Sequence, residues 1–200
     1  MSDARSIKAG LDIGKEISGQ LKESRLLEAR YILISEAVSS DTAERVVRDL
    51  LLMDEMNQNP ISIYVNSPGG EVNSGFAIFD TIRFIRSSVY IINTGLCASI
   101  ATVINMAAKK DHRFAMPNAM FLIHQPLISG QVIGPASDLE ITATQILKTR
   151  ERINQLFAKE CGHDLKKIEE DTSRDHWLTA EEACKYGLVC KVISSKKEIT

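Results

Sequence analysis

The stretch ISIYVNSPGGEVNSGFAIFDTIRFIRSSVYIINTGLCASIATVINMAA, residues 61–108, decides the fold class of this chain. ISIYVN (Ile61–Asn66) alternates as a β-strand does, and SVYIIN (Ser88–Asn93) is a second β-type run. Between them SPGG (Ser67–Gly70) predicts a sharp turn, and apolar residues at helical spacing follow it, namely Val72, Phe76, Phe79 and Ile82. After the second strand, IATVINMAA (Ile100–Ala108) predicts another helix. Strand, helix, strand, helix is the order typical of α/β proteins.

The same alternation continues outward in both directions. YILIS (31–35), MFLIH (120–124) and LVCKVI (188–193) are further β-type runs, and several of these runs are apolar nearly throughout. Nearly continuous apolar strands are typical of parallel sheets that helices cover on both faces. We therefore expect a largely parallel α/β core.

Capping signals mark the helices that separate these runs. Asp41 with Glu44 predicts the start of a helix that ends near Asn57, and Ser137 with Glu140 predicts the start of a long one. Thr179 with Glu182 begins a last short helix, which Gly187 ends. Residues 21–28 are expected to form a short helix after an unpatterned N-terminal arm.

Composition excludes several classes of protein. The chain has 200 residues, of which 44% are apolar and 25% charged, so it is neither disordered, collagen-like nor a disulfide-stapled miniprotein. A formal net charge of −2 gives no general attraction to nucleic acid or to an anionic membrane. No apolar run approaches the roughly 20 residues of a membrane helix, and the N-terminus has no signal-peptide core. We predict a cytoplasmic protein.

The cysteines do not indicate a metal site. The four of them form no CxxC pair and have no histidine at zinc-finger spacing; they are Cys97, Cys161, Cys184 and Cys190. We expect reduced thiols that pack as small hydrophobic side chains, and no bound metal.

Ser99 and His124 are the candidate catalytic pair. Ser99 lies at a strand-to-helix turn, where free N–H groups could face a developing oxyanion, although an ordinary helix-capping serine is the alternative. His124 ends an apolar strand, at the edge of a parallel sheet where ligand sites gather. A third group must orient the imidazole, and spacing leaves both Asp171 and Asp175 open. The consecutive glycines of SPGG let backbone approach a substrate and could free an N–H donor.

Four motifs together resemble the proteolytic subunits of the ATP-dependent Clp protease. They are NSPGG (66–70), G-x-x-A-S-x-A (95–101), IHQPL (123–127) and DTSRDHWLTAEEACKYGLV (171–189), and the likeness runs from about Ser24 to Ile193. The resemblance implies a crotonase-like spiral of ββα units with a protruding handle at about residues 125–160. It also implies that residues 1–23 form a mobile arm or axial loop and that residues 24–200 form one peptidase domain.

The family resemblance also assigns roles to single residues. It implies that Ser99 is the nucleophile, His124 the general base and Asp175 the orienting aspartate, with oxyanion donors at the backbone of Gly70 and Ile100. It implies that substrate contacts Gly69, Pro126 and Leu127, and that ring contacts involve Asp171 and Arg174.

At the level of assembly, the resemblance implies two stacked rings of seven subunits. An AAA+ unfoldase would feed unfolded polypeptides into their chamber. That unfoldase would consume the ATP, so this chain would need no cofactor of its own.

The first prediction is an active serine peptidase that hydrolyses peptide bonds through an acyl-enzyme. Three departures from the family pattern motivate an alternative, a divergent paralogue that is active only in a mixed ring with a second subunit type. The handle segment is longer and carries Pro135, residues 1–23 differ from the usual axial loop, and Cys97 lies near the proposed nucleophile. Two alternatives remain: a crotonase-type acyl-CoA enzyme, in which Ser99 is incidental, and a ring scaffold without catalysis.

Overall fold

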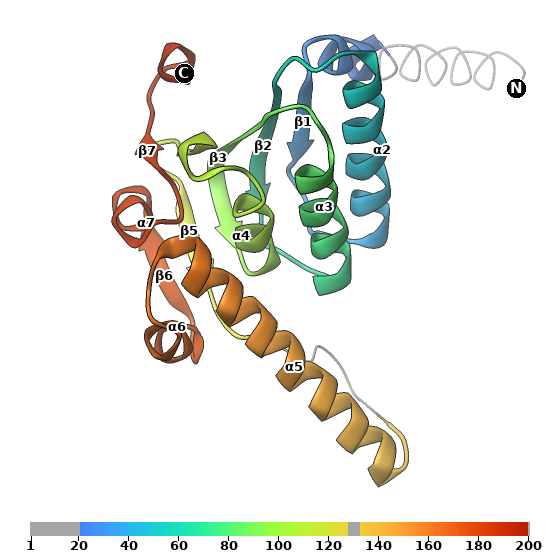
Figure 1. Cartoon of the computed structure of the whole chain (residues 1–200), viewed down its shortest axis with the longest axis vertical. Helices are drawn as coiled ribbons and strands as arrows, with labels where there is room; N and C mark the ends of the chain where they lie inside the picture. Colours follow the sequence, from blue (N-terminus) through green and yellow to red (C-terminus); the bar gives the residue numbers. More distant parts are fainter. Residues whose placement is uncertain (1–20, 128–132, 200) are drawn as a thin grey trace, which may run out of the picture.

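Strand β3 (Val89–Ala98) runs through the middle of a seven-stranded sheet (Figure 1). The computed structural model describes residues 21–127 and 133–199. Five strands follow the order β1-β2-β3-β4-β7, while β5 pairs with β3 and β6 with β5. The other strands are β1 (Tyr31–Ile34), β2 (Ile61–Ser67), β4 (Arg113–Ala115), β5 (Met120–Ile123), β6 (His176–Thr179) and β7 (Lys191–Val192).

Helices connect these strands in the alternating order that the sequence predicts. Residues 21–28 are helical, as expected, and two short 3-10 turns, η1 (Lys110–His112) and η2 (Lys196–Glu198), complete the order. The main helices are α2 (Ser40–Met56), α3 (Val72–Phe84), α4 (Ile100–Asn105), α5 (Ala136–Cys161), α6 (Leu165–Thr172) and α7 (Ala180–Tyr186). The last predicted strand, 188–193, is regular only at Lys191–Val192.

The predicted parallel sheet is confirmed, with one exception at its edge. Pairings β1–β2, β2–β3, β3–β4, β3–β5 and β4–β7 are all parallel, whereas β6 runs antiparallel to β5. The sequence analysis missed β4 and β6 because neither forms an apolar run: β4 begins with the charged Arg113, and β6 (His176–Thr179) mixes polar and apolar residues.

Strand β3 is longer than predicted and changes partner along its length. Its first half pairs with β4 at Ile91–Asn93, and its second half pairs with β5 at Leu96–Ala98. On its other edge the register with β2 shifts between these halves, since Val65 pairs with Asn93 but Ser67 pairs with Cys97. This bulge carries the strand onward to Ala98, where the sequence predicted a loop.

The two faces of the sheet are covered unequally, so the expectation of helices over both faces is wrong for the outer strands. In β3 the neighbours Ile91 and Ile92 are both fully buried, on opposite faces. In β1 and β2, however, burial alternates, and Leu33 keeps 40% of its surface exposed. The second face holds only a small cluster of Ile92, Phe114 and Ile193.

Two predicted helix starts need correction. Helix α2 is capped by Ser39, whose extended backbone lets its side chain accept a hydrogen bond from Thr42 N, while Asp41 lies inside the first turn. Helix α5 begins behind Pro135 without a side-chain cap, so Ser137 is already helical. The Thr179–Glu182 capping box and the left-handed Gly187 at the end of α7 are confirmed.

Helix α5 projects far from the sheet and forms the expected protruding element (Figure 1). Its last turns pack into the core through Ile153 and Phe157, which are buried. Its first turns leave apolar side chains in the open, with exposed fractions of 40% at Leu139, 61% at Ile141 and 53% at Leu147. Although α5 has 26 residues, no helix in the described part of the chain is long and apolar enough to cross a membrane.

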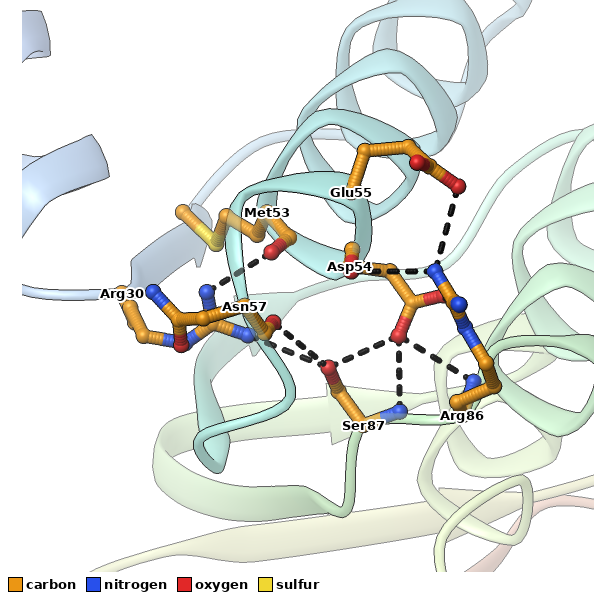
Figure 2. A network of polar contacts seen from close by, with 7 residues as sticks. All are labelled: Arg30, Met53, Asp54, Glu55, Asn57, Arg86 and Ser87. Carbon is orange, nitrogen blue, oxygen red and sulfur yellow. Dashed lines mark hydrogen bonds and ion pairs between the residues drawn. The ribbon is translucent and has the colours of Figure 1, made fainter.

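A buried carboxylate ties the end of α2 to the start of β3 (Figure 2). Asp54 is 7% exposed and accepts hydrogen bonds from the backbone N–H and the hydroxyl of Ser87, both at 2.8 Å. It also accepts bonds from the backbone and the Nε of Arg86, each at 3.1 Å. Arg30 completes the network by donating to Ser87 Oγ and to the carbonyl of Met53. Burial raises the pKa of Asp54, but these donors outweigh it and lower the pKa from 3.8 to about 2.

We expect Asp54→Asn to lower the free energy of unfolding by about 2 kcal/mol at pH 7, because an amide loses the charge-assisted bonds. The folded-state pKa lies below the unfolded one, so this stabilisation is present above about pH 4 and is lost as the pH falls toward 2. Urea unfolding at several pH values measures the effect. The exposed Asp80→Asn on α3 is the control; a pH-independent gap between Asp54→Asn and the unmodified protein would contradict the assignment.

Candidate active site

Ser99 stands at the junction of β3 and α4 in an unusual backbone conformation. Its φ of 55° and ψ of −127° are rare for a residue with a side chain and store about 1–3 kcal/mol of strain. The backbone is held by Ser99 N–H, which donates to the carbonyl of Leu122 at 2.9 Å. Ser99 occupies the helix-capping position, yet its side chain makes no capping hydrogen bond. The alternative that Ser99 is an ordinary helix-capping serine therefore has no support. Its hydroxyl makes no hydrogen bond to another described residue.

The strand register brings His124 opposite Asp175. In the antiparallel β5–β6 pair, Ile123 faces His176, so the next residues along the register are His124 and Asp175. The His124 Nδ1 atom lies 3.3 Å from Asp175 Oδ1. Ser99 N–H bonds to the carbonyl of Leu122 on the same strand, so the backbone of Ser99 lies next to a residue two positions before His124. No hydrogen bond joins Ser99 Oγ to His124 in the described part of the chain, and such bonds are often loose in resting enzymes.

Asp171, the other candidate partner for the histidine, is engaged elsewhere. Its Oδ2 accepts a bond from Lys167 Nζ at 2.7 Å and another from the Tyr186 hydroxyl at 2.7 Å. Burial raises the pKa of Asp171, but these two donors outweigh it and hold the pKa below its usual value. Geometry thus separates two aspartates that spacing left equivalent. Arg174 is exposed and lies one residue before Asp175.

The SPGG turn packs directly against Ser99. A Cβ on Gly69, whose φ is +87°, would lie 2.6 Å from the carbonyl oxygen of Ala98 and 2.7 Å from the Cβ of Ser99. Gly70 is pinned by Val38, whose N–H donates to the Gly69 carbonyl and whose carbonyl accepts from Glu71. Only glycine fits either position, because both conformation and space exclude a side chain.

Two backbone donors are left free beside Ser99. Neither the N–H of Gly70 nor the N–H of Ile100 donates to another described residue. Ile100 is the first residue of α4, where an N–H has no helical partner. Free donors next to a serine hydroxyl are what an oxyanion hole requires.

Cys97 does not compete with Ser99 as a nucleophile. Its side chain is fully buried, and burial raises the pKa of its thiol far above the usual value. A thiol that stays protonated is a poor nucleophile. Cys97 is packed inside as expected, but Cys190 is exposed, so the expectation that all four thiols pack as small hydrophobic side chains is wrong there.

Two polar residues that the sequence analysis did not single out support the site, Asn66 and Gln125. Asn66 Oδ1 accepts the N–H of Leu96 at 2.9 Å and so supports the bulge that leads to Ser99. Gln125 donates its backbone N–H to Thr172 O at 2.7 Å and its side-chain amide to Ser173 O at 2.9 Å. Asn66 lies within the NSPGG motif, and Gln125 directly follows His124. Their positions next to the candidate site residues could have identified them from the sequence.

Comparison with known proteins decides the family. The family model described as Clp protease matches residues 15–196. The chain belongs to the Clp protease family. ATP-dependent Clp protease proteolytic subunit 2 of Treponema denticola is 47% identical over 176 residues, covering 88% of this chain and 87% of that protein. Subunit 2 of Pseudomonas aeruginosa is 43% identical over 193 residues, covering 96% of this chain and 94% of that protein.

A solved Clp structure confirms the fold. A mutant of ClpP1 from Listeria monocytogenes matches with a TM-score of 0.81 and 38% identity, covering 88% of this chain and 98% of that one. The fold is therefore the crotonase-like fold of Clp proteases, and the chain is a serine peptidase, the proteolytic subunit of an ATP-dependent protease. Membership implies assembly into oligomeric rings that work with Clp ATPases.

The remaining sequence predictions lie at the edge of the described structure. Pro126 and Leu127 continue from β5 past His124, and Leu127 is 72% exposed, as a residue that borders a substrate strand would be. The predicted N-terminal arm falls mostly on residues 1–20, and part of the handle on residues 128–132. Both lie outside the described residues.

We expect Gly69→Ala to slow active-site labelling of this Clp subunit at least 100-fold, because its Cβ must displace the Ala98–Ser99 backbone. The control is Gly162→Ala, which has a similar φ of +76° but no atom within 4 Å of the added Cβ. That change should cost only about 1 kcal/mol of stability and leave labelling unchanged. Fluorophosphonate labelling kinetics with thermal unfolding of both variants would test this; equal labelling rates would contradict it.

Proposed function

We propose that this Clp subunit hydrolyses peptide bonds with Ser99 as nucleophile, His124 as general base and Asp175 as the orienting carboxylate. The observation that carries the proposal is the meeting of three strand ends. A strained serine is hydrogen-bonded through its backbone to Leu122, two residues before a histidine whose Nδ1 is 3.3 Å from an aspartate. These are the roles and the neighbours that an acyl-transfer triad needs.

The reaction begins when His124 Nε2 takes the proton of the Ser99 hydroxyl as the oxygen attacks the peptide carbonyl. Asp175 fixes the tautomer of the imidazole through Nδ1 and stabilises the imidazolium that forms. The same histidine then gives the proton to the leaving amine. Water, activated by His124, finally hydrolyses the acyl-enzyme.

The oxyanion of the tetrahedral intermediate is assigned to the N–H groups of Gly70 and Ile100. Both donors are free of other described partners; Ile100 directly follows Ser99, and Gly70 directly follows Gly69, which lies against Ser99. They are rigid, since Gly70 is fixed by Val38 and Ile100 by the start of α4. Losing one such donor typically costs roughly 100- to 1000-fold in rate. Gly69, Pro126 and Leu127 are assigned to the walls along which the substrate strand lies.

We further propose that the subunit works in two stacked heptamers. The exposed apolar residues of α5, Leu139, Ile141 and Leu147, supply a surface that needs a partner, because apolar patches on an isolated helix are unfavourable in water. Asp171 and Arg174 are assigned to contacts between subunits. Arg174 neighbours Asp175, so ring contacts there would bear directly on the triad.

The proposed partner is a AAA+ unfoldase that delivers unfolded polypeptides and consumes the ATP. The proposed chemistry at Ser99 uses only side chains, backbone N–H groups and water, so this chain is assigned no cofactor. Because the unfoldase depends on ATP, we place the complex in the cytoplasm. Relatives named as subunits 2 and 3 support a mixed ring with a second subunit type as the second candidate arrangement.

Treatment of the purified chain with a fluorophosphonate probe tests the nucleophile. We expect an adduct on Ser99, located by mass spectrometry, in a particle of ring size, and no adduct in Ser99→Ala. The control Ser35→Ala, at an exposed serine, should label normally. Labelling only after a second subunit type is added would support the mixed ring. A ring that never labels would favour the scaffold role, and thioester turnover that survives Ser99→Ala would favour the acyl-CoA alternative.

The two aspartates should separate kinetically. We expect Asp175→Asn to lower peptide turnover by about 10⁴-fold with the fold intact, because an amide favours the wrong tautomer of His124. Asp171→Asn should instead weaken its contacts with Lys167 and Tyr186 and change assembly, measured by sizing. Equal kinetic defects in the two variants with unchanged assembly would leave the assignment of Asp175 unsupported.

A further inference from the structure

A basic cleft lies apart from the residues of the proposed active site. Its volume is about 440 Å³, and it lies between the end of α3 with the turn after it and the η1–β4 segment. Five of its lining side chains are basic and one is acidic. They are Arg83, Arg86, Lys109, Lys110 and Arg113, against Glu160.

The arginines of the cleft are fixed by carboxylates. Arg83 donates to Glu160 Oε1 at 2.8 Å, and Arg113 pairs with the other oxygen of Glu160. One carboxylate thus neutralises only one of two guanidinium groups. Arg86 is held by Asp54 and Glu55 at 3.1 Å each, as Figure 2 shows. Because these ion pairs already fix the arginine side chains, binding of a ligand would cost little further conformational entropy there.

The lysines of the cleft supply the free charge. Within the described residues, the side chains of Lys109 and Lys110 make no hydrogen bond or ion pair, and both residues are exposed. Together with the surplus charge of the Arg83–Arg113–Glu160 group they supply three positive charges, and the second carboxylate on Arg86 reduces the net charge around the hollow to about two. Such a concentration of charge in a concave wall attracts multivalent anions.

Buried polar atoms without hydrogen-bond partners also lie in residues that line this cleft. Only three buried side-chain polar atoms in the described residues have no hydrogen-bond partner. Two of these belong to cleft residues, Nη1 of Arg113 and Nδ1 of His112. Arg113 is 1% exposed, and an unsatisfied guanidinium nitrogen at that depth is costly. Both atoms are closed off from solvent, so an anion in the cleft would offset part of that cost through its charge and without contacting them.

We propose that the cleft binds a small oligophosphate anion. A chain of two or three phosphates concentrates several negative charges in the hollow, and guanidinium groups bind phosphate oxygens with two parallel bonds. The volume is within the range of small-ligand pockets. The inference does not depend on the proposed catalysis, because the cleft shares no residue with that site.

Calorimetric titration of the assembled full chain with inorganic tripolyphosphate, ATP and hexaglutamate tests the proposal. We expect tripolyphosphate to bind with Kd below 1 mM at low salt and more weakly as ionic strength rises. The double variant Lys109→Gln/Lys110→Gln should lower that affinity at least tenfold. The matched control, Lys166→Gln/Lys185→Gln, removes two exposed lysines outside the cleft and should change nothing.

Each result bears on the proposal in one direction. Equal affinity for tripolyphosphate and ATP would mean that the phosphates alone are recognised, and tighter ATP binding would mean that the nucleoside contributes; both support an oligophosphate site. Binding of hexaglutamate without tripolyphosphate would overturn it in favour of an acidic peptide. No binding, or equal loss in the cleft and control variants, would overturn it outright. Circular dichroism of each variant confirms that the fold is retained.

Discussion

The whole site depends on the way in which strand β3 changes partner. One strand pairs with β4 in its first half and with β5 in its second, and a bulge against β2 makes room for the change. Since the strand is fixed on both edges, its end is fixed too, and Ser99 is held in a strained conformation that an isolated turn would not keep. The pairing of β3 within the sheet holds Ser99 in this strained conformation. Rigid secondary structure positions reactive side chains more precisely than loops do.

The SPGG turn depends on the same strand. β2 and β3 end side by side, so the turn after β2 meets the turn after β3, and Gly69 contacts the backbone of Ala98. At the opposite ends of these strands, the buried Asp54 fixes the backbone at Arg86 and Ser87, where β3 is about to begin. Both ends of the central strand are therefore tied to other elements by contacts that tolerate little change.

Much of the fold could be predicted from sequence because its signals are local. Alternating and continuous apolar runs gave the strands around residues 61 and 88, and Thr179 with Glu182 gave a capping box that the structure contains. The short strands β4 and β6 could not be found, because their residues, unlike those of the equally short β1 and β5, form no apolar run and are recognised only by their pairing in the sheet. The caps at Ser39 and Pro135 were missed because the first turn of each helix itself contains capping types, Asp41 in α2 and Ser137 in α5, and propensity does not rank them.

The sequence by itself determined which residues could do chemistry: a serine and a histidine at strand ends, two aspartates downstream and a pair of glycines. Only the tertiary structure placed one aspartate, Asp175, at 3.3 Å from the histidine and engaged the other, Asp171, with Lys167 and Tyr186. The reason is that the antiparallel register of β5 and β6 joins segments about fifty residues apart, and register is a property of paired strands. The basic cleft is likewise a product of folding, since its arginines and lysines come from separate segments that only the packed structure brings around one hollow.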